Sequence, residues 1–109
     1  MRSSIDFRPA NILMRTQCLG MTYWWLRELV VTDQGLEWEI WKYQHRVKMT
    51  LPYERMARAA LLPGSAGFDL QISGTTSTDN LLVRGLNHLD GVKVLSIIER
   101  CLARERLIA

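Results

Sequence analysis

Four basic side chains gather in one short stretch of the chain: Lys42, His45, Arg46 and Lys48. Cations at the lip of a loop can hold a phosphorylated group through charge-assisted hydrogen bonds. The stretch also alternates polar and apolar residues, and the polar positions of such a strand are ordinarily solvated. Glu37 and Glu39 lie on the preceding predicted strand, where they can pair with Arg46 and Lys48 across the ladder. The acids favour a solvated strand face, with an anion-binding site as the alternative.

Large aromatic residues form a second group: Tyr23, Trp24, Trp25, Trp38, Trp41, Tyr43 and Tyr53. Because side chains alternate between the two faces of a strand, Trp38 is expected to point inward. Trp41 and Tyr43 then take the outer face, and one of Trp24 and Trp25 does the same. Exposed aromatic residues on a sheet favour a protein–protein interface, which we expect at Trp25, Trp41 and Tyr43. Burial within the monomer and stacking on a ligand are the alternatives.

The sequence contains no pattern that predicts catalysis, a metal centre or a cofactor. His45 and His88 are isolated, and the hydroxyls between residues 73 and 78 come without a nucleophile elbow or a triad. Neither GxxxxGK[ST] nor GxGxxG is present. Cys18 and Cys101 lie far apart among apolar neighbours, which predicts reduced thiols in a reducing compartment. We therefore expect a cytoplasmic protein without enzymatic activity.

Composition indicates one ordinary globular domain spanning residues 1–109. The chain is 48% hydrophobic and 23% charged, which argues against disorder. The net charge is +3, but 14 basic residues are interleaved with 11 acidic ones, so no nucleic-acid partner is expected. The N-terminus does not resemble a signal peptide, and residues 12–26 are too short and polar to span a membrane. Peripheral contact with an anionic inner-membrane surface stays open.

Alternation between Glu28 and Leu86 predicts a series of strands. We expect them at residues 27–32, 36–40, 46–51, 67–73 and 80–85. A bulged turn with a left-handed Gly35 is expected after Asp33, and a polar bend at 43–45. The side chains expected to point inward are Leu36, Trp38, Ile40, Val47, Met49, Leu51, Phe68, Leu70 and Ile72.

Five other segments are less regular. Residues 52–55 are expected to form a short helical turn or an irregular corner. Residues 56–62 predict a strand with a helix as competitor, because three alanines occur there. Residues 63–67 and 74–79 are expected to be a loop and a polar turn. In the N-terminal segment 1–25, residues 12–15 and 21–25 fit strands, or a short helix followed by a strand.

The C-terminal tail predicts one amphipathic helix over residues 88–105, capped by Asn87 or Asp90. Its apolar stripe contains Val94, Ile97, Ile98, Cys101 and Leu102. Such a stripe has one partner surface, so we expect the helix to close the sheet core over Val47, Met49, Phe68, Leu70 and Ile72.

The order of these segments resembles the bacterial pleckstrin-homology-like domains. The resemblance rests on residues 30–36, 51–56, 62–64 and 81–85, followed by the helix from Asp90 to Ala103. It implies a mainly β fold, a barrel of about seven antiparallel strands in two near-orthogonal sheets with one capping C-terminal α-helix. It brings no catalytic residues. We expect a non-catalytic interaction module that forms a homo-oligomer, with anionic-ligand or phospholipid head-group binding as the alternative.

Overall fold

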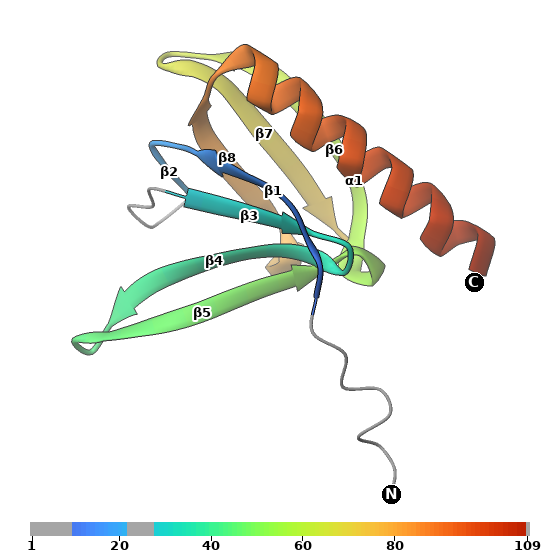
Figure 1. The fold of residues 1–109 in the computed structure, drawn as a ribbon, viewed down its shortest axis with the longest axis horizontal. Coiled ribbons are helices and arrows are strands. Elements are labelled where there is room, and N and C mark those ends of the chain that lie inside the picture. Colours follow the sequence, from blue (N-terminus) through green and yellow to red (C-terminus); the bar gives the residue numbers. More distant parts are fainter. Residues whose placement is uncertain (1–9, 22–27, 109) are drawn as a thin grey trace, which may run out of the picture.

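The computed structural model describes residues 10–21 and 28–108 and is mainly β (Figure 1). Its strands are β1 (Ile12–Gln17), β2 (Gly20–Met21), β3 (Glu28–Thr32), β4 (Gly35–Lys42), β5 (His45–Pro52), β6 (Met56–Gly64), β7 (Gly67–Gly74) and β8 (Leu81–Leu86). Two short 3-10 helices are η2 (Tyr53–Arg55) and η3 (Ser77–Asp79), and the α-helix α1 covers His88–Ile108. The predicted strand at residues 21–25 lies mostly outside the described residues.

The strands form two antiparallel sheets, in the orders β1-β3-β4-β5 and β2-β8-β7-β6. The strands of the second sheet run across those of the first (Figure 1). The chain passes from one sheet to the other three times, between β1 and β2, between β2 and β3, and between β5 and β6. The prediction of two antiparallel sheets and one C-terminal helix is confirmed.

The expected closure into a barrel is wrong. β5 and β6 are outer strands of different sheets. They are connected along the chain by η2 and do not share a hydrogen-bonded ladder. At the crossing from β1 to β2, the residues Cys18 and Leu19 separate the two strands, and the two-residue β2 pairs with β8. The crossings from β5 to β6 and from β1 to β2 therefore interrupt the strand pairing that a closed barrel requires.

The corner between the sheets is held by Tyr53. Its hydroxyl donates a 2.6 Å hydrogen bond to the Thr32 carbonyl, and its backbone N–H donates to the Gln34 carbonyl at 3.1 Å. Burial raises the pKa of the Tyr53 phenol far above its ordinary range, because the ionised form would lose its hydration. The short helix predicted at residues 52–55 is thus confirmed as η2 and anchored to the turn between β3 and β4.

Two turn predictions differ from the structure. Gly35 does not have a positive φ; it lies against the Leu51 carbonyl, where a Cβ would clash. The loop predicted at 63–67 is shorter, because Pro63 and Gly64 belong to β6. β6 is an outer strand, so a proline without an N–H costs it no ladder bond when that position faces solvent. The predicted strand at residues 56–62 is confirmed over its helical competitor.

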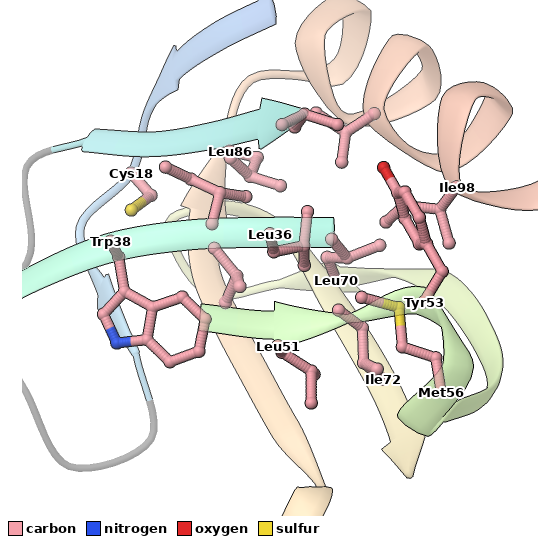
Figure 2. Packing of buried hydrophobic residues seen from close by; sticks show 14 of the residues in the cluster. Cys18, Leu36, Trp38, Leu51, Tyr53, Met56, Leu70, Ile72, Leu86 and Ile98 are labelled. Atoms are coloured by element: carbon pink, nitrogen blue, oxygen red, sulfur yellow. The ribbon is translucent and has the colours of Figure 1, made fainter. Parts of the chain in front are cut away.

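The helix packs against β6, β7 and η2 and covers one side of the core (Figure 1). Val94, Ile98, Cys101 and Leu102 are buried, as the apolar stripe predicted, and Ile97 is partly buried against the same cluster. Figure 2 shows Ile98 beside Tyr53, with Leu70 and Ile72 beneath them. The helix therefore closes the core over Leu70 and Ile72 of β7, as the sequence indicated.

Three side chains expected in this core are not fully buried. Val47 and Phe68 are half-buried, and Met49 is 36% exposed. Phe68 stacks on His88, with ring centroids 4.7 Å apart, at the start of the helix. Val47 and Met49 lie on the β4–β5 hairpin, whose tip lies far from α1 (Figure 1). The inward face of the hairpin therefore extends beyond the surface that the helix covers.

Candidate functional site

The tip of the β4–β5 hairpin is a tight two-residue turn, not a wider polar bend. Lys42 pairs with His45, and the intervening Tyr43 and Gln44 have φ values of 52° and 65°. Two positive φ angles are typical of the type I′ turn, which usually contains Asn or Gly. A tyrosine seldom adopts this conformation, and its side chain is 84% exposed here. The hairpin therefore presents a large aromatic side chain on a conformation that costs free energy.

The predicted pairing of acids and bases on this hairpin is confirmed for one pair. Lys48 lies directly opposite Glu39, and its Nζ is 3.0 Å from a carboxylate oxygen of Glu37. The Glu37 side chain is only 17% exposed, whereas that of Lys48 is 64% exposed. Part of the charge of Lys48 is thus already neutralised within the strand pair.

The other predicted site residues are only partly placed. His45 and Arg46 are exposed on β5, and the backbone of Trp41 lies opposite Arg46. Trp41 and Lys42 belong to β4, but their side chains lie outside the described part of the chain, as does all of Trp25. The structure therefore brings the basic candidates and two of the aromatic ones to one hairpin. It does not test the proposed contribution of Trp25.

The inward face of the hairpin is apolar. Trp38 and Ile40 are buried, and they lie opposite Met49 and Val47 in the ladder. Figure 2 shows the Trp38 indole at the end of the core away from Ile98. Its Nε1 is buried and finds no hydrogen-bond partner among the described residues. The core thus continues under the base of the hairpin, and Met49 marks the place where solvent reaches it.

β5 is an outer strand, so one side of its backbone lacks a neighbouring strand in its sheet. The Tyr53 N–H bonds the Gln34 carbonyl just beyond the end of the ladder. In an antiparallel pair, alternate residues bond the same neighbour. Leu51 and Met49 therefore direct their backbone groups toward β4, while Thr50 and Lys48 direct theirs toward the open edge. The sequence does not predict this open edge, because the alternation of residues along a strand does not reveal the order of strands in a sheet.

A separate polar cleft of about 460 Å³ lies between β1 and the start of α1. It is lined by Arg15, Thr16, Gln17, Glu28, Gly85, Asn87 and Asp90. Thr16 donates a 2.9 Å hydrogen bond to Asp90, and Arg15 pairs with Glu28 at 3.0 Å. The Asn87 side chain accepts the Asp90 N–H at 2.8 Å. These polar groups bond one another, so the cleft is a junction that ties β1 to the helix.

Comparison with known protein families and with curated proteins finds no match to this chain. Within residues 10–21 and 28–108, no cluster of three or more His, Cys, Asp or Glu side chains is placed to hold a metal ion. Among the described helices, none has the length and apolar character needed to cross a membrane.

Proposed function

We propose that this chain is a non-catalytic protein-interaction module that self-associates through the β4–β5 hairpin. The observation that carries the proposal is the exposure of one outer strand. The exposed members of β5 are His45, Arg46, Lys48, Met49 and Thr50. An outer strand offers backbone donors and acceptors to any strand that can lie beside it. Tyr43 adds an exposed aromatic group at the tip, a residue type enriched in protein interfaces.

Binding of an anionic ligand or phospholipid head group is the weaker proposal for the same hairpin. The exposure of His45 and Arg46 supports it, whereas the pairing of Lys48 with Glu37 and the nearby Glu39 oppose it. Sedimentation with anionic liposomes at low salt would favour this proposal if the protein were carried down and released at high salt.

The relationship to bacterial pleckstrin-homology-like domains is likewise a proposal. It is supported by the order of the elements, strands in two sheets followed by one C-terminal helix. A reducing, cytoplasmic location is supported by Cys18 and Cys101, both buried thiols.

Light scattering over a concentration series tests the preferred function. We expect a mass above that of the monomer, rising with concentration. Tyr43→Asn should shift assembly toward the monomer without loss of stability, because asparagine tolerates a positive φ. Leu107→Ala removes another exposed apolar side chain, far along the sequence, and serves as the matched control. A wild-type protein that stays monomeric at high concentration would refute the proposal.

A further inference from the structure

We propose that the open edge of β5 pairs antiparallel with β5 of a second copy, so that two four-stranded sheets join into one. This inference rests on the proposed self-association and specifies its geometry. The backbone groups that would bond are those of Lys48 and Thr50, which point away from β4. Pro52 has the same orientation and lacks an N–H, so no outward donor continues beyond Thr50 at that end.

Lysine on an outer strand normally discourages such pairing. Here the Lys48 ammonium group is 3.0 Å from the Glu37 carboxylate of its own strand pair, and Glu39 lies directly across from it. The charge that would repel a second copy is therefore partly neutralised. Both acids belong to β4, so a strand arriving at the open edge would leave them in place.

The remaining charges and Pro52 together favour one register. An axis at Thr50 would place Lys48 opposite Pro52, which has no N–H to donate in return. A two-fold axis at Val47 would place Arg46 opposite Lys48 of the second copy, and an axis at Lys48 would place two lysines opposite each other. Like charges directly opposed across a ladder are destabilising. An axis at Met49 places Lys48 opposite Thr50 instead, so this register has no opposed like charges. It also lets Lys48 and Thr50 exchange both of their backbone hydrogen bonds.

The same register places apolar residues together on the inward face. The two Met49 side chains face each other across the axis, and Val47 lies opposite Leu51 of the second copy. Met49 is 36% exposed in the single chain, and Val47 is half-buried. Pairing would cover the part of the core that the helix leaves open to solvent, a favourable burial of apolar surface.

Single-cysteine cross-linking in the full chain tests this register. Met49→Cys, Lys48→Cys and Val47→Cys each place a thiol on a different candidate axis. In the proposed register, residue 49 forms a non-hydrogen-bonded pair whose Cα atoms are about 4.5 Å apart, within the range that a disulfide spans. We expect mild oxidation to give a covalent dimer with Met49→Cys and little with the other two. The parent chain, with its thiols at Cys18 and Cys101 buried, is the control.

The two experiments together distinguish failure of the β5 pairing from failure of the proposed self-association. Wild-type protein that assembles in light scattering, but cross-links best at 47 or 48 or at none of the three, would overturn the proposed pairing and leave self-association standing. Wild-type protein that is monomeric in light scattering would overturn both.

A backbone substitution gives an independent measurement. Thr50→Pro removes an outward N–H, whereas Thr50→Val keeps the N–H and a similar shape. We expect the dimer dissociation constant to rise at least roughly tenfold for Thr50→Pro and to change little for Thr50→Val. Each copy loses one interfacial bond, and the two bonds lost per dimer together correspond to at least that factor. Circular dichroism establishes that both variants keep the fold. Equal dissociation constants for the two folded variants would contradict the β5 pairing.

Discussion

Asp79 carries an ion pair that fixes the corner of the molecule. Its carboxylate accepts hydrogen bonds from the Arg55 guanidinium through both oxygens, and a further bond from the Thr76 hydroxyl at 3.1 Å. The Asp79 side chain is nearly buried, whereas that of Arg55 is half exposed. Hydrogen bonding from Arg55 lowers the pKa of Asp79 below its ordinary value of 3.8, although burial opposes the shift. The pair joins η3, which lies between β7 and β8, to η2 at the corner between the sheets.

This shift predicts an acid-sensitive contribution to stability. Because the folded pKa of Asp79 is lowered, the contribution is present above 3.8 and is lost as the pH falls through the lower folded value. We expect Asp79→Asn to lower the melting temperature at neutral pH, and the difference from wild type to shrink at acidic pH. Thermal unfolding measured against pH checks this. Glu54→Gln removes an exposed carboxylate next to Arg55 and should cause a much smaller change at every pH.

At the scale of elements, the start of α1 is fixed by its cap and by a strand. The Asn87 side chain accepts the Asp90 N–H, and Asp90 in turn accepts the buried Thr16 hydroxyl of β1. The first amides of a helix lack partners within it, so the cap satisfies a group that would otherwise need water. The carboxylate in the first turn also suits the positive end of the helix dipole.

Asn87→Ala should therefore reduce the free energy of unfolding by roughly 1 kcal/mol, the usual value of a lost N-cap. Urea unfolding followed by circular dichroism measures the change. Ser96→Ala, at an exposed position in the middle of the same helix, is the matched control and should be neutral or slightly stabilising. If both variants lost the same stability, the cap would not be the reason that the helix begins at His88.

In the β4–β5 hairpin, by contrast, the pairing of the strands outweighs the conformational preference of the turn residues. Tyr43 and Gln44 are poor residues for a turn with two positive φ angles, yet the ladder from Gly35↔Pro52 to Lys42↔His45 leaves only these two to connect the strands. Pairing along both strands therefore stabilises a turn that the local sequence does not favour. The conformational free-energy cost is concentrated at Tyr43 and Gln44, at the tip where the proposed interaction surface begins.

At the scale of the whole molecule, the helix is the element that completes the core. Ile98 is fully buried between α1 and the sheets (Figure 2). Leu107, near the end of the same helix, is 87% exposed. Ile98→Ala should lower the free energy of unfolding by about 2–4 kcal/mol, from lost burial and the cavity left behind. Leu107→Ala should change it by less than about 0.5 kcal/mol. Denaturant unfolding measures both, and similar losses would mean that the stripe does not close the core.

The sequence alone determined the elements whose signals are local. Alternation predicted the inward positions of Leu36, Leu70 and Ile72, and helical spacing predicted that of Ile98. The ion pair of the hairpin was also predictable, because Glu37 and Lys48 lie on the same face of neighbouring strands. Each of these inferences needs only the period of a strand or a helix and the identity of its neighbours.

Only the tertiary structure decided which surfaces remain open. Met49 and Leu51 lie on the same face of β5, but Met49 is exposed and Leu51 is buried. The difference arises because the hairpin extends past the helix, a relation between segments far apart in the chain (Figure 1). Strand order made β5 an outer strand, and the interrupted crossings left the sheets unclosed. Burial and strand order depend on what lies opposite a residue in space, which periodicity along the chain does not encode.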